Sequence, residues 1–163
     1  MKRISIAIVG LNFGRLIVDQ IVRGPGQKYF QLAAVCDLDR AKAEAMAREH
    51  KCKAYASLDA LLADPAIPAI GLFSGPVGRA ALLRKIIRAG KDVMTTKPFE
   101  VDPAAALSVL REAKRRKRII HLNSPAPLLS ADMEQMARWR DEFDLGRPIG
   151  ARAESWANYR EKA

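Results

Sequence analysis

The sequence predicts an α/β fold with a doubly wound parallel sheet. Strand-like and helix-like patterns alternate along the 163 residues with short connections between them, as such a sheet requires. Within the first forty residues, an apolar run, a glycine-flanked turn, a helix and a second apolar run ending on an acid follow one another. That order is typical of the opening half of a Rossmann dinucleotide-binding domain.

The glycine-flanked turn follows a strand predicted over Ile4–Val9. Glycine lets a backbone turn tightly beside a pyrophosphate, and the N–H groups that begin a helix attract anions. The spacing Gly-x-Asn-x-Gly is one residue shorter than the usual Gly-x-Gly-x-x-Gly, but asparagine tolerates left-handed backbone better than most residues. With a helix expected to begin near Arg15, the predicted pyrophosphate-binding residues are Gly10, Leu11, Asn12, Phe13 and Gly14.

An acidic residue, Asp37, directly follows the second predicted strand, Leu32–Cys36. At this position a carboxylate is placed to hydrogen-bond the adenosine ribose of a dinucleotide. Because a carboxylate repels a 2′-phosphate, Asp37 favours NAD as the cofactor. Arg40 lies three residues further on and would attract such a phosphate, which leaves NADP open.

The rest of the chain continues the alternation of helices and strands. Asp39 and Ser57 are predicted helix N-caps, and Asp102 followed by Pro103 marks another helix start. The further predicted elements are helices over 40–50, 58–63, 78–89, 104–116 and 131–142 (the last capped by Ser130), strands over 53–56, 70–73, 92–96 and 119–122, and an extended segment over 149–159.

Several predicted strands are followed by small or polar residues suited to a ligand site. Open parallel sheets bind ligands beyond the carboxyl ends of their strands, so these residues meet on one edge although they are far apart in the chain. We predict that this edge holds the cofactor. Besides the turn and Asp37, its predicted cofactor-binding residues are Ser74, Gly75, Pro76, Thr96, Lys97, Pro98 and Asn123.

Composition indicates neither a nucleic-acid partner nor a membrane span. The net charge is +10, and six of the eight residues from Arg111 to Arg118 are Lys or Arg. These residues close a predicted helix, where cations complement the C-terminal dipole, and few aromatic residues lie among them for base stacking. No apolar run approaches the ~20 residues of a membrane span. Cys36 and Cys52 lack metal-ligand spacing and are expected to be reduced thiols, which suits a cytoplasmic protein.

One segment resembles a known family. Gly90–Phe99, GKDVMTTKPF, is similar to the A-G-K-H-V-x-x-E-K-P segment of the Gfo/Idh/MocA oxidoreductases. Ser57–Ala66 resembles the short helix and A-D-P stretch of that family, and residues 74–76 stand in place of its Thr-Pro or Ser-Pro loop. The resemblance extends over residues 4–158. It implies hydride transfer between a nicotinamide cofactor, NAD or NADP, and a sugar or polyol-like substrate, with Lys97 as a catalytic residue at the nicotinamide end.

The chain also departs from the pattern of that family. Thr96 replaces the glutamate before the lysine, and Arg79 stands where many members have a histidine. The Asp-x-x-x-His pair of the family is absent, because neither His50 nor His121 follows an aspartate at that spacing. Two explanations stay open for His121: a strand residue satisfied by local hydrogen bonds, or a polar group near the nicotinamide.

The resemblance implies a division of the chain into two parts. Residues 1–124 would form the Rossmann domain, and residues 125–163 a linker helix and the first strand of a C-terminal substrate domain that is truncated here. In that case the chain is the cofactor-binding part of an oxidoreductase. The alternative is a non-catalytic nucleotide-binding or oligomerisation module, in which the extended segment 149–159 pairs with a second copy, since an exposed strand edge is a template for pairing.

Overall fold

The computed structural model describes residues 3–123, 131–147, 149–150 and 152, and its contacts divide the chain into two units, residues 1–124 and 125–163. The strands of the first unit are β1 (Ile4–Val9), β2 (Phe30–Cys36), β3 (Lys53–Tyr55), β4 (Ala69–Leu72), β5 (Asp92–Thr96) and β6 (Ile120–Asn123). Its helices are α1 (Leu11–Val22), α2 (Arg40–His50), α3 (Leu58–Leu62), α4 (Arg79–Arg88) and α5 (Pro103–Arg115), with a short 3-10 helix, η1 (Pro25–Lys28), before β2.

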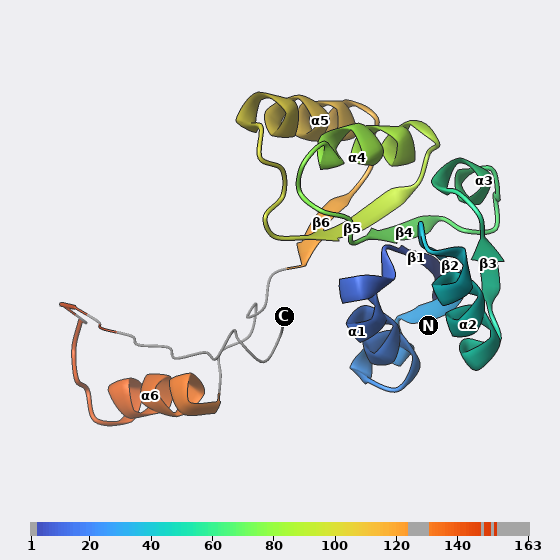
Figure 1. The fold of residues 1–163 in the computed structure, drawn as a ribbon. Coiled ribbons are helices and arrows are strands. Elements are labelled where there is room, and N and C mark those ends of the chain that lie inside the picture. The colour runs from blue at the N-terminus through green and yellow to red at the C-terminus, as the bar shows by residue number, and fades with distance from the viewer. Residues whose placement is uncertain (1–2, 124–130, 148, 151, 153–163) are drawn as a thin grey trace. The chain divides into compact units, whose positions relative to one another are not determined.

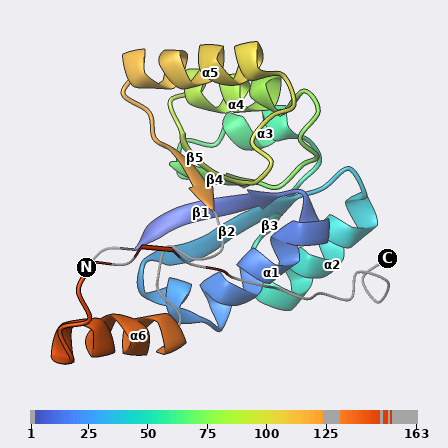
Figure 2. The ribbon, with the colours of Figure 1, turned by 90° about the vertical axis from the view of Figure 1, so that its left-hand side faces the viewer.

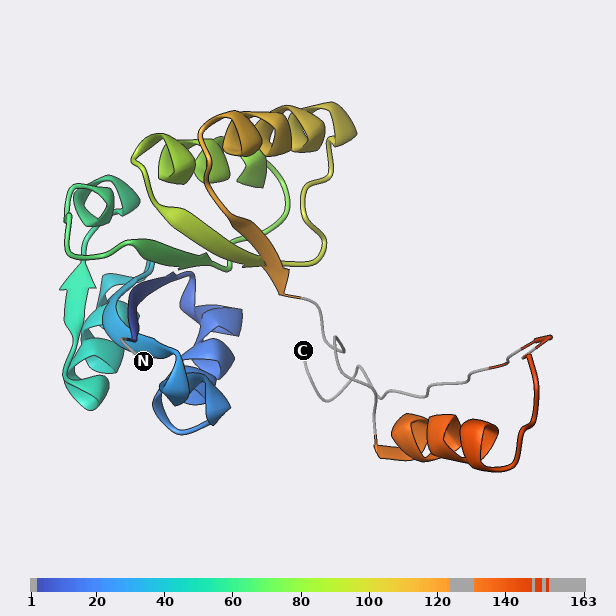
Figure 3. The same cartoon turned by 180° about the vertical axis from the view of Figure 1, so that it is seen from behind.

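The six strands form one sheet in the order β3-β2-β1-β4-β5-β6, and every paired strand is parallel to its neighbour (Figure 1). Figure 3 shows the same sheet from behind, with β3 and β6 at its two edges. The chain moves outward from β1 in one direction through β2 and β3, and then in the other direction through β4, β5 and β6. This order confirms the doubly wound Rossmann fold.

Helices cover both faces of the sheet (Figure 2). Helices α1 and α2 lie on one face, and α3, α4 and α5 lie on the other. The buried residues of β1 alternate between these layers: Ile6 and Ile8 pack with Val18 of α1, whereas Ala7 packs with Leu83 of α4. Because a strand covered on both faces must bury every side chain, β1 is a nearly continuous apolar run in the sequence.

The predicted capping residues begin their helices as expected. A side-chain oxygen of Asp39 accepts from the N–H of Lys42 at 3.1 Å, Ser57 accepts from Ala60 at 3.1 Å, and Asp102 accepts from Ala104 at 2.8 Å. Each bond satisfies an N–H group that has no partner within its own helix. Local chemistry therefore determines where α2, α3 and α5 begin.

The predicted start of the first helix is wrong. Helix α1 begins at Leu11, not near Arg15, and the N–H of Gly14 already donates to the carbonyl of Gly10 at 3.1 Å. The physical reason is that Gly10, with φ of 85°, makes the whole turn, so no further loop residue is needed. The other predicted strands and helices are found in the described residues, with ends that agree within two residues. Asn123, predicted in a loop, ends β6.

The second unit contains helix α6 (Ala131–Glu142), as predicted. Its expected cap, Ser130, and most of the extended segment predicted over 149–159 lie outside the described residues. The interpretation of residues 125–163 as a linker helix and the first strand of a further domain stays a prediction.

The cysteines and the basic run can be compared with what composition predicts. Both cysteines are free thiols, Cys36 buried and Cys52 half-buried. The basic run closes α5, where Arg116 pairs with Glu112 at 3.0 Å. No helix in the described part of the chain is long and apolar enough to cross a membrane.

Candidate cofactor site

A cavity of about 420 Å³ opens at the carboxyl edge of the sheet. It lies where the chain reverses direction across the sheet, between the ends of β1, β2 and β4, which is the usual ligand position in doubly wound folds. Five residues predicted from the sequence line it together: Gly10, Asn12, Asp37, Ser74 and Gly75. The remaining lining residues are apolar or small: Val9, Cys36, Leu38, Ala56, Ser57, Leu58, Leu72, Phe73 and Leu82.

Gly10 and Gly14 serve different purposes. A Cβ added to Gly10 would lie 2.8 Å from the carbonyl oxygen of Phe73, so the backbones after β1 and β4 approach too closely for any side chain. Gly14 is buried instead, and a Cβ there would lie 2.8 Å from Cγ2 of Ile8. Gly14 therefore permits close packing of α1 on β1, while Gly10 shapes the cavity.

The N-terminus of α1 is open toward the site. The helix has no side-chain cap at Gly10 and no acidic residue in its first turn. Asn12 and Phe13 are exposed there, whereas Leu11 is buried. The Nζ of Lys42, from α2, donates to Oδ1 of Asn12 at 2.9 Å, so a cation also lies at this helix start. The N–H of Leu11 donates to Asp37, so it is the N–H groups of Asn12 and Phe13 that, with the charge of Lys42, favour an anion.

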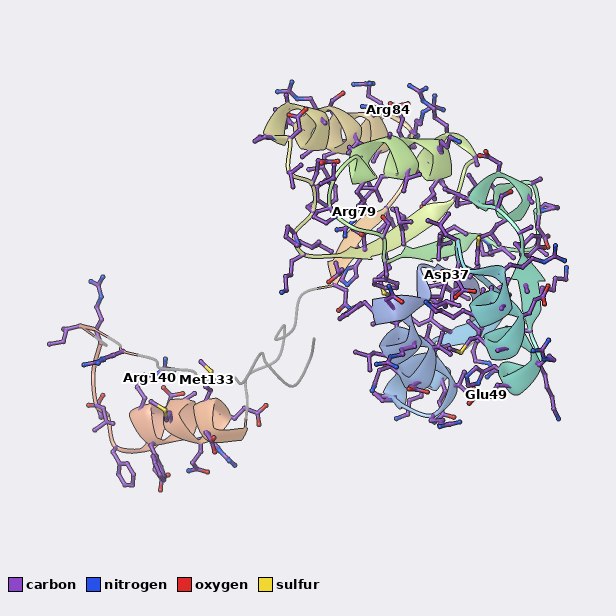
Figure 4. All side chains as sticks on the ribbon, viewed as in Figure 1. Asp37, Glu49, Arg79, Arg84, Met133 and Arg140 are labelled. Atoms are coloured by element: carbon purple, nitrogen blue, oxygen red, sulfur yellow. The ribbon has the colours of Figure 1, made fainter. Side chains whose placement is uncertain are left out.

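Asp37 connects the end of β2 to the start of α1 (Figure 4). Its Oδ2 accepts from the N–H of Leu11 at 2.6 Å, and its Oδ1 accepts from the N–H of Asp39 at 2.9 Å. Burial alone would raise the pKa of Asp37, but these two bonds and the charge of Lys42 outweigh it and lower the pKa below the ordinary value. The carboxylate is therefore ionised and fixed, and it keeps lone pairs for further donors.

Arg40 does not reach this site. Its Nε donates to Oε1 of Glu44 at 2.8 Å on the exposed side of α2. Asp37 is the only charged residue among the described residues that line the cavity, and none of them is Lys or Arg. The lining therefore offers a carboxylate and no guanidinium to a ribose.

Apart from the turn at α1, the other predicted residues lie at the ends of β5 and β6 or on the loops that follow β4 and β5. Pro76 is half-buried after β4, while Lys97 and Pro98 are exposed after β5 and are joined by a cis peptide bond. Oγ1 of Thr96 donates to the carbonyl of Asn123 at 3.3 Å, which links the ends of β5 and β6. None of these residues lines the 420 Å³ cavity. The five predicted residues that line the cavity form a cavity group, and Pro76, Thr96, Lys97, Pro98 and Asn123 form a loop group. Leu11, Phe13 and Gly14, at the start of α1, belong to neither.

Sequence reasoning did not identify the residue that joins these loops. Arg79 is buried at the start of α4, and its guanidinium donates to the carbonyls of Ser74, Thr96 and Pro98 (Figure 4). One signal was present, because Arg79 precedes Leu83 by four residues and so belongs to the buried face of α4.

His121 belongs to a different part of the molecule. It lies in β6 opposite Met94 and lines a separate cavity of about 360 Å³, together with apolar residues such as Phe30 and Ile119. That cavity shares no lining residue with the one at the carboxyl edge. His121 is therefore not a member of the candidate cofactor site.

The fold and this edge define a dinucleotide-binding Rossmann domain. The model of the oxidoreductase family with an NAD-binding Rossmann fold, Gfo/Idh/MocA, matches residues 4–124. The chain therefore belongs to the Gfo/Idh/MocA oxidoreductase family, and NAD is the cofactor of the domain that matches.

Individual relatives agree with this assignment. An uncharacterised oxidoreductase of Synechocystis sp. is 28% identical over 118 residues, which are 70% of this chain and 30% of that protein. The UDP-N-acetylglucosamine 3-dehydrogenase of Acidithiobacillus ferrooxidans is 28% identical over 116 residues, 69% of this chain and 36% of that enzyme. GenD2 from gentamicin A biosynthesis, in a crystal structure with NAD, shares the fold with a TM-score of 0.69 at 20% identity, over 76% of this chain and 35% of that one. The chain spans about a third of the length of the curated relatives it matches.

Proposed function

We propose that this chain is the cofactor-binding part of an oxidoreductase that transfers a hydride between NAD and a carbinol of a sugar or polyol-like substrate. The observation that supports it most is the cavity at the carboxyl edge, where the Gly10 backbone, the start of α1 and the Asp37 carboxylate meet. The UDP-N-acetylglucosamine 3-dehydrogenase among the relatives supports a sugar as the substrate.

The residues present fit a dinucleotide. Gly10 lies too close to the Phe73 carbonyl for any side chain, so no Cβ intrudes there, and the N–H groups at the start of α1 with Lys42 suit a pyrophosphate. Asp37 would accept from the hydroxyls of the adenosine ribose. Since it repels a 2′-phosphate and Arg40 is paired with Glu44, we expect NAD to bind more tightly than NADP.

The loop group would surround the nicotinamide end. When bound, nicotinamide supplies the acceptor or donor of the hydride. The exposed ammonium of Lys97 would then lie near the reacting hydroxyl, where a positive charge stabilises a developing alkoxide and an amine can exchange its proton. Thr96, Pro98, Asn123 and the 74–76 loop would orient this end of the site.

The proposed arrangement of the whole protein follows the family. Residues 1–124 would be the dinucleotide-binding domain, and residues 125–163 would begin a substrate domain. This chain alone would then bind the cofactor without turning over substrate.

Titration with NADH, followed by the fluorescence of the reduced nicotinamide, tests the proposal. We expect saturable binding in the micromolar range, with weaker binding of NADPH. The absence of saturable binding for both cofactors would overturn it.

A further inference from the structure

The guanidinium of Arg79 lies among backbone carbonyls of two loops at the carboxyl edge. Its Nη1 donates to the carbonyl of Thr96 at 2.5 Å and to that of Pro98, with the Phe99 carbonyl at 3.4 Å. Its Nη2 donates to the carbonyl of Ser74. The contacts to Thr96 and Pro98 thus fall on either side of Lys97, while the contact to Ser74 holds the loop after β4.

This burial is costly for the fold. Arg79 is 2% exposed, forms no ion pair with a carboxylate in the described residues, and its buried Nε has no hydrogen-bond partner there. Burial lowers the pKa of Arg79, although the charge of Glu100 opposes this effect. A buried cation without a carboxylate partner is stabilised poorly compared with an apolar side chain of similar size. Stability alone therefore does not account for an arginine here.

Glu100 makes the reciprocal connection. It lies in the loop that Arg79 contacts, and its Oε2 accepts from the N–H of Ala80 at 2.7 Å, in the first turn of α4. The N-cap of α4, Gly78, has no side chain, so the Glu100 carboxylate takes the place of a side-chain cap. The start of α4 thus holds the loop after β5 through Arg79, and that loop holds α4 through Glu100.

We infer that Arg79, with Glu100 opposite, is a positioning residue that holds the Lys97–Pro98 segment against the 74–76 loop and so forms the nicotinamide side of the cofactor site. The inference rests on the proposed function. It assigns the two residues to binding of the nicotinamide half, because Arg79 holds the carbonyls of Thr96 and Pro98 in the loop group and Glu100 holds α4 against the same loop. The ADP half would meet the cavity group, whose contacts depend mainly on Gly10 and Asp37.

The chain offers a matched control in Lys91. It is also a buried cation, 4% exposed, and its Nζ donates to the carbonyls of Asp64 at 2.6 Å and Ile67 at 2.7 Å. These contacts join the segments that precede β4 and β5, so they lie at the amino ends of the two strands whose carboxyl ends Arg79 joins. Removal of Lys91 costs the same kind of interaction at the opposite edge of the sheet.

The experiment compares NADH with ADP-ribose, which lacks the nicotinamide, on the full chain and its Arg79→Met and Lys91→Met variants. We expect Arg79→Met to weaken the binding of NADH by about tenfold and that of ADP-ribose by less than about threefold. The smaller loss for ADP-ribose reflects the contact to Ser74. Lys91→Met should bind both ligands as the parent chain does. Equal losses for the two ligands, unchanged NADH binding by Arg79→Met, or the same selective loss in Lys91→Met would each overturn the inference.

If Arg79→Met does not fold, a second variant tests the inference. Glu100→Gln keeps the shape of the side chain and removes the charge that binds the start of α4, so we expect the same selective loss of NADH, by about threefold. Equal binding of NADH by Glu100→Gln and the parent chain would then overturn the inference. If the parent chain binds neither NADH nor ADP-ribose, the proposed function fails as well; if the parent and Arg79→Met bind both ligands alike, only the positioning role fails.

Discussion

Asp37 has a structural role in the fold, and the proposed function adds a binding role for the same side chain. Its two oxygens already accept from the N–H groups of Leu11 and Asp39, which fixes the carboxylate at the mouth of the cavity. A carboxylate held in this way has lost its rotamer freedom before a ribose arrives, so binding costs less entropy. The bond from Leu11 also takes the place of the missing side-chain N-cap of α1.

The substitution Asp37→Ala should therefore weaken the binding of NADH more than the binding of NADPH. For NADH it removes hydrogen bonds to the ribose, and we expect a loss of about tenfold. For NADPH it also removes a repulsion, so the loss should be smaller. Fluorescence titrations of both cofactors measure the difference, and equal losses would contradict a role of Asp37 at the ribose.

Asp39→Ala is the control for this substitution. It removes the side-chain N-cap of α2 and should cost about 1 kcal/mol of unfolding free energy, as the loss of such a cap typically does. It leaves the Asp37 carboxylate in place. Cofactor binding should therefore stay unchanged while stability falls.

At the level of elements, one buried carboxylate joins two helices. Glu112 of α5 accepts from Nε of Arg88 at 2.7 Å, of Arg84 at 3.0 Å and of Arg116 at 3.0 Å. The hydrogen bond from Arg88 has the largest effect on the pKa of Glu112. Together with the bonds from Arg116 and Arg84, it outweighs burial and lowers the pKa to about 2. Helices α4 and α5 are thus connected by a carboxylate that stays charged in mild acid.

This network predicts how stability changes with pH. Because the folded pKa lies below the ordinary value of 4.5, Glu112 stabilises the fold fully above about pH 4.5 and loses this contribution as the pH falls toward 2. Glu112→Gln should be less stable at neutral pH, and its difference from the parent chain should shrink in acid. Urea unfolding at pH 7, 5, 4 and 3 measures it.

The control is Asp59→Asn, which removes an exposed ion pair with Lys85 of α4 at 3.1 Å. Exposed pairs contribute little, so this variant should follow the parent chain at every pH. A difference between Glu112→Gln and the parent chain that does not change with pH would show that the network does not act through ionisation.

At the scale of the whole molecule, cofactor binding and folding are linked. The cavity is lined by segments that follow β1, β2, β3 and β4, so it exists only when the sheet is assembled. A ligand that binds only the folded state stabilises it by mass action. At an NADH concentration 100-fold above its dissociation constant, unfolding should cost about 2.7 kcal/mol more.

Urea unfolding with and without NADH checks this prediction. The shift should grow with the logarithm of the NADH concentration, and at the same concentration it should be smaller for Asp37→Ala. An unfolding midpoint that does not move at saturating NADH would contradict specific binding to the folded sheet.

Local patterns in the sequence were sufficient for most of the fold and for part of the site. Strands appear as apolar runs, and three helices begin directly after their caps, Asp39, Ser57 and Asp102. Both signals can be predicted because caps and periodicity act over a few residues. The start of α1 was mispredicted, because Gly10 makes a turn that the usual motif spreads over more residues. The place of Gly10 and Asp37 at one cavity followed from strand order.

The buried Arg79 marks the limit of such reasoning. The order of strands and helices, the turn at Gly10 and the acid at Asp37 are local or periodic features, so the amino-acid sequence alone predicts the Rossmann fold and the ribose end that we propose for the site. Which loop Arg79 holds depends on carbonyls 17 and 19 residues away, which only parallel pairing of β4 and β5 brings within reach. The arrangement of the loops proposed for the nicotinamide side is therefore decided by tertiary structure, because backbone carbonyls carry no signature in the sequence.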